Sequence, residues 1–318
     1  MVTVMKGSAR ERYLRDSSSP IESYRASAWL DQGRISQLLH APECNSGSTL
    51  HRVHPIERLR FVARSQGAPA DVLVQESALA LSAFRDDPAG MVAACRRIID
   101  RHLTCSPLWW LCARMLCAPD AMQEARAAVA EIESDPTAKL LAQALPADAS
   151  VVIIGWPEQA VGALRRRGDL EVFIVDVEGE SDEAVRQLER IDVVATAVPA
   201  RNAAAAVALA DVVILECFAL GPEKLLAPAG SLAAAAVASH LGVEVWALAG
   251  AGRMLPASMF DALVSRWSGS VEPLGTTAEI VPHELVTSCA CVGGVGAISE
   301  SLKATDCPVA PELFRLAG

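Results

Sequence analysis

Five short, almost entirely apolar runs, separated by segments of helix length, constrain this chain more than any other feature of its sequence. The runs are VVIIG at 151–155, EVFIVD at 171–176, VVATAVP at 193–199, DVVILE at 211–216 and VEVWALAG at 243–250. Strands without a polar face are covered on both sides, which is typical of parallel strands joined by helices. Crossover helices are predicted at 157–167, 181–190, 200–210 and 230–241. We therefore expect an α/β fold with a Rossmann-like domain and a doubly wound, mainly parallel sheet.

The part of the chain before these strands has the apolar spacing of helices. Helices are predicted at 71–84, 88–102, 107–117 and 120–132, each after a proline or a short polar residue that suits a helix start. We predict a helical domain at 54–146 and the Rossmann-like domain at 147–318. Residues 1–53 have few periodic apolar positions, so we expect a poorly ordered arm.

The composition disfavours several classes of function. The chain has 318 residues, 52% of them apolar, and a formal net charge of −10 at pH 7. A chain with this negative charge does not attract the phosphates of nucleic acid. No apolar run reaches the ~20 residues that a membrane span needs. The nine cysteines include no C-x-x-C pair and no nearby histidine that completes a zinc site. We expect reduced thiols, a cytoplasmic protein and no bound metal.

The start of the segment 230–241 is the strongest candidate for an anion site. Gly230 permits close approach of the backbone, and Ser231 can cap a helix whose first amides carry a partial positive charge. A phosphate fits such a place, although an ordinary capped helix is the alternative. We predict Gly230 and Ser231 as ligand-binding residues.

Other candidates follow the ends of the predicted strands, where open parallel sheets bind ligands. Gly250, Gly252 and Arg253 form a loop whose guanidinium suits a phosphate or a carboxylate, with a salt bridge as the alternative. Asp176 ends the second strand, and Trp156 follows the first. The first turn reads GWPEQAVG instead of G-x-G-x-x-G, so we expect no dinucleotide cofactor.

Two further side chains at a strand end are candidates for catalysis. Glu216 and Cys217 bring a carboxylate and a thiol to the functional edge of the sheet. Such a pair can serve as acid/base and nucleophile. However, no histidine or lysine close in sequence activates the thiol, and one of the two side chains can be buried. Neither residue is a firm catalytic assignment.

Three stretches carry a resemblance to a known family. DVVILECFALGPEKLLAPAGSLAAAAVASHLGVEVWALAGAGRMLP at 211–256 and VPHELVTSCACVGGVGAIS at 281–299 are similar to parts of the alpha, beta and delta subunits of translation initiation factor 2B and the related isomerases of methylthioribose 1-phosphate and ribose 1,5-bisphosphate. The stretch 106–116, with the turn 66–70, is a weaker match. The resemblance implies a helical domain before a Rossmann-like domain, and a homodimer with residues 293–296 and 308–314 near its interface.

The departures from this family concern its chemistry. Phe218 stands where the isomerases carry an aspartate, and Gly155-Trp156-Pro157-Glu158 stands where their catalytic cysteine is expected. Gln66 replaces an arginine associated with phosphate, and Ala227-Pro228 replaces an Asn-Lys pair. By this resemblance, the anion cradle is partly kept and the groups for isomerisation are absent.

The sequence therefore favours a noncatalytic relative, or pseudoenzyme, that binds a phosphorylated sugar or nucleotide and has a regulatory or scaffolding role. One alternative is a sugar-phosphate isomerase or lyase that uses Glu216 and Cys217. Another is a protein–protein interaction module without a ligand. We expect no cofactor; the predicted partners are a phosphorylated small molecule and a second copy of the chain.

Overall fold

The central sheet consists of the five predicted apolar strands and two more at one edge. The computed structural model describes residues 55–65, 67–177, 179, 181–272 and 274–314. The strands are β1 (Ser150–Ile154), β2 (Glu171–Asp176), β3 (Val194–Pro199), β4 (Val212–Glu216), β7 (Glu244–Ala249), β9 (Ser288–Cys291) and β10 (Gly294–Gly296). Their order is β10-β9-β7-β4-β1-β2-β3, and every neighbouring pair is parallel except β9 and β10. The predicted α/β class with a mainly parallel sheet is confirmed.

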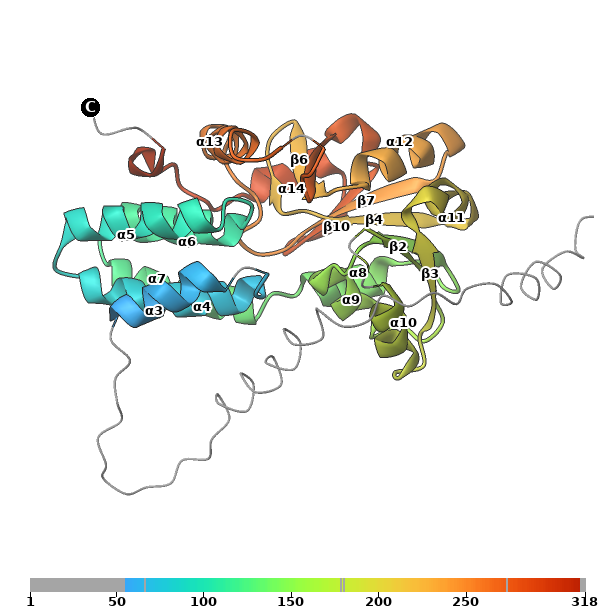
Figure 1. Cartoon of the computed structure of the whole chain (residues 1–318), viewed down its shortest axis with the longest axis horizontal. Coiled ribbons are helices and arrows are strands. Elements are labelled where there is room, and N and C mark those ends of the chain that lie inside the picture. The colour runs from blue at the N-terminus through green and yellow to red at the C-terminus, as the bar shows by residue number, and fades with distance from the viewer. Residues whose placement is uncertain (1–54, 66, 178, 180, 273, 315–318) are drawn as a thin grey trace, which may run out of the picture. The chain divides into compact units, whose positions relative to one another are not determined.

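Helices cover both faces of this sheet, as Figure 1 shows. On one face pack α8 (Thr137–Ala144), α9 (Glu158–Leu164) and α10 (Ser181–Glu189), and on the other α11 (Ala203–Leu209) and α12 (Ser231–Leu241). In β1, Val151 and Ile153 pack with the first group and Val152 and Ile154 with the second. Because helices cover both faces, inner strands such as β1 and β4 can be almost entirely apolar, and the sheet is doubly wound.

Four helices before the sheet begin within one residue of the predicted starts, namely α4 (Ala70–Leu81), α5 (Pro88–Arg101), α6 (Ser106–Cys117) and α7 (Ala121–Glu133). A further helix, α3 (Pro55–Arg64), precedes them. The side chain of Asp87 accepts a hydrogen bond from the amide of Gly90, and Asp120 accepts from the amides of Met122 and Gln123. Each cap of this kind contributes ~0.5–2 kcal/mol, because it satisfies amides that the helix leaves free.

A small second sheet, which the sequence analysis did not predict, joins these helices to the main sheet. It contains β5 (Ala219–Leu220), β6 (Lys224–Pro228) and β8 (Ala278–Pro282), and α13 (Ala257–Ser268) lies next to it in the chain order. Leu226 of β6 and Phe260 of α13 belong to the same buried cluster as Leu111 of α6. Val53–Gly318 forms one compact unit. The boundary at residue 146 stays a prediction, and the arm 1–53 lies outside the described residues.

The described residues also bear on membranes, thiols and metals. No helix among them is long and apolar enough to cross a membrane. All eight cysteines in the described segments are free thiols. Within the same segments, no group of three or more His, Cys, Asp and Glu side chains could hold a metal ion.

Candidate functional site

The strand order reverses at the neighbouring strands β1 and β4. From β1 the chain continues outward through β2 and β3, whereas from β4 the sheet continues outward through β7 and β9. In open parallel sheets the ligand crevice lies beyond the carboxyl ends of the strands at such a switch point. The segment from Gly155 to Glu158 follows β1, and Glu216 ends β4. These residues therefore define the candidate site.

The carboxylate of Glu216 fills the switch point. Its Oε2 accepts hydrogen bonds from the amides of Gln159 at 2.9 Å and Ala160 at 3.2 Å, both in the first turn of α9. Its Oε1 lies 3.0 Å from Nη2 of Arg253, and both side chains are buried. In Rossmann folds an anionic ligand lies against the amides of this first helix. Here the chain places one of its own carboxylates there.

Arg253 is directed into the protein by this ion pair. Its Nη1 donates to the carbonyl oxygen of Cys217, and its backbone carbonyl accepts from the amide of Leu220. Two guanidinium nitrogens therefore have partners within the chain. Recognition of a ligand by Arg253 stays a prediction, and the alternative of a salt bridge is the arrangement observed.

Cys217 follows Glu216 but lies in the core. Its residue surface is fully buried, and burial raises the pKa of its thiol well above the usual value of 9.0. At neutral pH the sulfur is therefore a thiol, whereas the thiolate is the nucleophile. Both Glu216 oxygens already accept hydrogen bonds or pair with Arg253. The catalytic roles of these two residues stay predictions.

Glu158 is a functional candidate that the sequence analysis did not select. It is the first residue of α9, and although the residue as a whole is exposed, protein atoms crowd its carboxyl group. This burial, with repulsion from the Glu216 carboxylate, raises the pKa of Glu158 to about 7. A carboxyl group that titrates near pH 7 can exchange protons at that pH. Its position directly after β1, at the switch point, is the signal that could have identified it.

Two residues from the helical segment lie near the same carboxylates. The charge of Asp71 in α4 adds to the rise in the pKa of Glu158. Burial raises the pKa of the Cys105 thiol to about 11, and the nearby charges of Arg253 and Glu158 act on it in opposite directions. Among the described residues, the site thus combines the carboxyl groups of Asp71, Glu158 and Glu216 with the guanidinium of Arg253. An excess of acidic groups repels a phosphate.

The start of α12, the predicted anion cradle, also holds a carboxylate. The amide of Leu232 donates to Oε1 of Glu279, which lies on β8, at 2.5 Å. Gly230 has a φ of +95°, and a side chain there would approach Val177. The hydroxyl of Ser231 is buried and has no hydrogen-bond partner in the described part of the chain. Ligand binding by Gly230 and Ser231 stays a prediction.

The loop after β7 is held by side chains as well. The amide of Gly250 donates to Oε1 of Gln159 at 3.2 Å, and the amide of Ala251 donates to Oδ2 of Asp135 at 2.8 Å. Gly252 has a φ of +72°, and an added Cβ would lie 3.0 Å from the ring of Trp110. The amides of Gly250 and its neighbour Ala251 thus have partners within the protein, and ligand binding by Gly250 and Gly252 stays a prediction.

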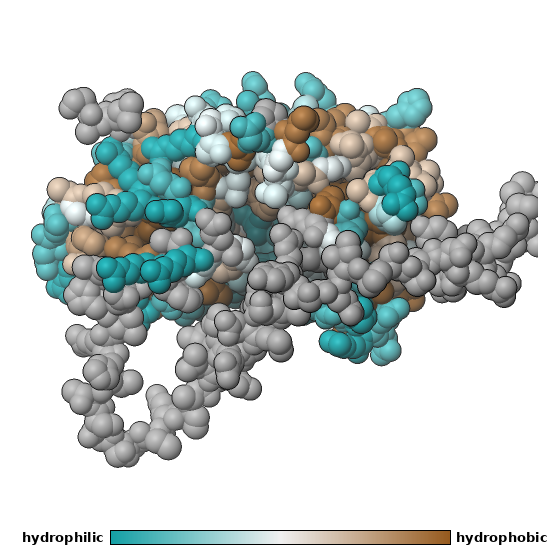
Figure 2. Space-filling model, in the orientation of Figure 1, coloured by the Kyte–Doolittle hydropathy of each residue, from teal (hydrophilic) through white to brown (hydrophobic). Residues whose placement is uncertain are grey.

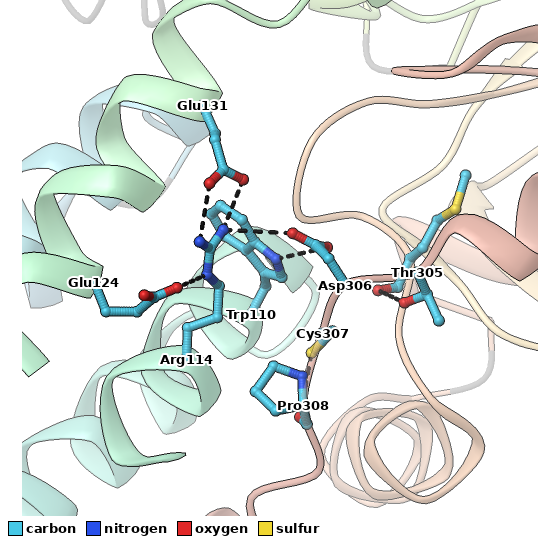
Figure 3. Close-up of polar contacts among 9 residues, drawn as sticks. Trp110, Arg114, Glu124, Glu131, Thr305, Asp306, Cys307 and Pro308 are labelled. Atoms are coloured by element: carbon cyan, nitrogen blue, oxygen red, sulfur yellow. Dashed lines mark hydrogen bonds and ion pairs between the residues drawn. The ribbon is translucent and has the colours of Figure 1, made fainter. Parts of the chain in front are cut away.

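A cavity of about 310 Å³ lies beside this loop and is not lined by Arg253. Its lining includes Gly250, Gly252, Trp110, Glu131, Thr305 and Asp306. Figure 3 shows the guanidinium of Arg114 between Glu124, Glu131 and Asp306, beside Trp110. Arg114 pairs with both carboxylates of the lining and with Glu124, so its single positive charge is shared among three carboxylates.

The remaining predicted residues have local roles. Oδ1 of Asp176 accepts from the amide of Gly179 at 2.6 Å, which closes the turn after β2. Trp156 packs against the core on the α8–α10 face. Phe218 packs with the helical core, and its carbonyl accepts from the hydroxyl of Ser106.

Of the predicted site residues, the structure therefore joins Glu216 with Arg253, while the side chain of Asp176 bonds within its own turn. Gln66 lies outside the described residues.

These features define the class of protein. Helices precede a Rossmann-like sheet, and an internal ion pair occupies the switch point of that sheet. Three solved structures with this fold are translation initiation factor 2B from Pyrococcus horikoshii OT3, the tetrameric beta2–delta2 complex of initiation factor 2B from Chaetomium thermophilum, and 5-methylthioribose 1-phosphate isomerase from P. horikoshii OT3. The respective identities are 12%, 17% and 14%, with TM-scores of 0.64, 0.64 and 0.56.

Each alignment covers 78% of this chain and, in the same order, 98%, 91% and 86% of the solved chain. No protein-family profile matches the sequence, and no curated protein matches it. The resemblance inferred from the sequence is thus confirmed as a likeness of fold.

Proposed function

We propose that this protein is a noncatalytic relative of the initiation factor 2B subunits that acts as a scaffolding or regulatory subunit through protein contacts. The observation that carries the proposal is the Glu216–Arg253 pair at the switch point. Glu216 bonds the amides of Gln159 and Ala160 and pairs with Arg253, so the place of a substrate anion is taken by the chain itself. Proton transfer needs a carrier that is free to reach the substrate.

The likeness to the isomerases supports the same view. Phe218 stands where the resemblance places their aspartate, and an aromatic ring cannot move a proton. Cys217, the other catalytic candidate, is fully buried. The fold is thus retained with a hydrophobic residue and an internal ion pair in the region of the isomerases' reacting groups.

A phosphorylated sugar or nucleotide as ligand is the second candidate. It is favoured by the hydroxyl of Ser231, which is buried without a partner among the described residues at the start of α12. Such a ligand has to replace the carboxylate of Glu279 at the amide of Leu232. A Glu279→Gln variant, which removes this negative charge, is therefore expected to bind phosphate more tightly if the second candidate is right.

The experiment combines turnover with thermal unfolding. We expect no isomerisation of 5-methylthioribose 1-phosphate or ribose 1,5-bisphosphate, and no rise in melting temperature of the wild type or Glu279→Gln with ribose 5-phosphate or AMP. Ligand at ~100 times its dissociation constant would add about 2.7 kcal/mol of stability. Turnover that is lost in Glu158→Gln would refute the noncatalytic assignment. Stabilisation lost in Ser231→Pro, with that variant folded, would favour the ligand instead.

The proposal includes self-association and a reducing compartment. One solved structure of the same fold is a tetrameric complex, which supports an oligomeric role for this chain. The free thiols of the described residues support a cytoplasmic location, because disulfides are rare there.

A further inference from the structure

The cavity beside the loop after β7 has a buried apolar wall and an exposed polar rim. Its volume of about 310 Å³ is at the lower end of the range for pockets that hold small molecules. Trp110 and Met254 are buried parts of its lining, whereas Glu131 and Asp306 are exposed. A ligand in this cavity therefore meets apolar atoms inside and carboxylate oxygens at the entrance.

The cavity differs from the site that the family resemblance implies. Phe218 and the segment 155–158, where the resemblance places the reacting groups of the isomerases, are not among its described lining residues. Glu216 and Arg253, which occupy the switch point, are not among them either. A ligand of this cavity is therefore an addition to the proposed function, and it leaves the noncatalytic assignment unchanged.

The rim of the cavity carries more negative charge than the chain neutralises. Its charged residues are Glu131 and Asp306, and the described lining contains no lysine, arginine or histidine. The guanidinium of Arg114 pairs with both carboxylates and also with Glu124, as Figure 3 shows. Three carboxylates around one guanidinium leave a formal excess of two negative charges, which a second cation can reduce.

The two carboxylates of the rim are close together and unequally bound. Glu131 places its oxygens 2.7 and 2.9 Å from two nitrogens of Arg114. Oδ2 of Asp306 lies 3.4 Å from Nη1 of Arg114, and its Oδ1 accepts from the indole N–H of Trp110 at 3.0 Å. Because Oε2 of Glu131 and Oδ2 of Asp306 both approach Nη1, these two oxygens are at most about 6 Å apart. One ammonium group, which has three donors, can reach both.

The end of α7 adds to the negative potential of the cavity. Glu131 is in the last turn of this helix, and Ser134 and Pro136, which follow it, are also part of the lining. The carbonyl groups at a helix C-terminus carry a partial negative charge that favours a cation. Figure 2 shows hydrophilic residues over much of the helical segment, and the formal net charge of the chain is −10. Cations are therefore attracted at longer range as well.

We propose that this cavity binds a small organic cation with a short aliphatic chain, such as a diamine. One ammonium group pairs with Asp306 and Glu131, and the methylene groups pack on the apolar wall at Trp110 and Met254. A metal ion fits less well, because the described residues contain no group of three or more His, Cys, Asp and Glu side chains that could hold one. A phosphorylated compound is repelled by the carboxylates of the rim.

Isothermal titration calorimetry of the full chain with 1,4-diaminobutane tests the site. We expect one bound ligand per chain, with a dissociation constant below ~1 mM for a ligand of this size. Butane-1,4-diol has the same carbon chain without the charges and should show no binding. Higher salt should weaken the binding of the diamine, because the carboxylates of the rim are open to ions.

Asp306→Asn tests the charge of the rim. This variant removes the carboxylate that is held least closely by Arg114 and keeps an oxygen that can accept from Trp110. It should bind the diamine about 5-fold more weakly or worse, the factor expected for the loss of one partly exposed ion pair. Glu133→Gln is the matched control. Glu133 ends α7 and is exposed, but it is not part of the described lining, so this variant should bind as the wild type does.

Val292→Trp separates the cavity from its charges. Val292 is 43% exposed and lines the cavity, so a larger side chain there reduces the space for a ligand while every carboxylate is kept. We expect binding of the diamine to weaken at least as much as in Asp306→Asn. An unchanged melting temperature without ligand shows that each variant is folded.

Four results would overturn the proposal in different ways. Equal binding by the wild type and Asp306→Asn would place the diamine elsewhere on the chain. Equal losses in Asp306→Asn and Glu133→Gln, or binding of Mg²⁺ as tight as that of the diamine, would reduce the effect to a general attraction of cations. Undiminished binding by folded Val292→Trp would show that the cavity is not involved. Tighter binding of a capped lysine peptide than of the diamine would assign the cavity to a side chain of another protein.

Discussion

Arg253 and Arg114 each hold separate segments of the chain together, but in different surroundings. Arg253 and its partner Glu216 have side chains that are only 9% and 6% exposed. Arg114 is 12% exposed, whereas its partners Glu124, Glu131 and Asp306 are 28%, 46% and 56% exposed. The first pair has little access to water if a partner is lost, and the second group can turn to solvent. The same type of interaction should therefore have unequal energetic weight at the two places.

The largest expected effect is that of Arg253→Met. This substitution leaves the Glu216 carboxylate buried with its amide bonds but without its counter-ion. Removing one partner of a buried ion pair typically costs about 3–5 kcal/mol of unfolding free energy. Urea unfolding measures the loss, which should change little between low and high salt because a buried pair is poorly screened.

The double variant Glu216→Gln/Arg253→Met separates charge from packing. It has no uncompensated carboxylate, and we expect it to be more stable than Arg253→Met alone. If the single substitution costs less than ~1 kcal/mol, the pair lies in a more polar setting than its burial indicates. The contrast with Arg114 would then disappear.

Arg114→Met should have an intermediate effect of about 2 kcal/mol. Partly exposed ion pairs contribute ~0–1 kcal/mol each, and the guanidinium also lies 4.5 Å from the centre of the Trp110 ring. High salt should reduce the difference between variant and wild type, because the carboxylates are open to ions. Lys139→Met, at an exposed position of α8, serves as the control. Equal losses for Arg114→Met and Arg253→Met would contradict the comparison.

The fold could be predicted from the sequence because its strong signals are local. Runs such as VVIL at 212–215 are apolar throughout, and prolines such as Pro88 and Pro107 stand in the first turns of their helices. The second sheet was missed because β5 has only two residues and β6 ends in Pro228. A strand of two residues has no periodic pattern, and β6 forms because it pairs with β5 on one side and β8 on the other and packs on the helices.

The site could be predicted only in part. Glu216 and Arg253 were both selected, since each follows or ends a strand at the functional edge of the sheet. Their pairing was not predicted, because it depends on side-chain direction across β4 and β7. Glu279 was also missed: β8 places it at the start of α12, and no local pattern connects these two segments. The sequence thus located the edge of the sheet but did not show which charges neutralise each other there.

The smallest expected effect concerns Glu158, which lies near the Arg253 charge without being neutralised by it. Burial raises its pKa from 4.5 to about 7, so between these pH values the folded protein binds more protons than the unfolded chain. Stability from this group is therefore fully present below pH 4.5 and is lost as pH rises through 7. Solvent around the exposed residue limits the change to below about 1 kcal/mol.

Glu158→Gln should remove this dependence on pH, because glutamine resembles the protonated carboxyl group. We expect the variant and the wild type to have similar melting temperatures at pH 5 and the variant to melt higher at pH 8. Glu189→Gln, at an exposed position of α10, should shift the melting temperature by the same amount at both pH values. If the curves for Glu158→Gln and the wild type run parallel, the Glu158 carboxyl group is not crowded by its neighbours. The acidic field at the switch point would then be weaker than the Glu216–Arg253 arrangement indicates.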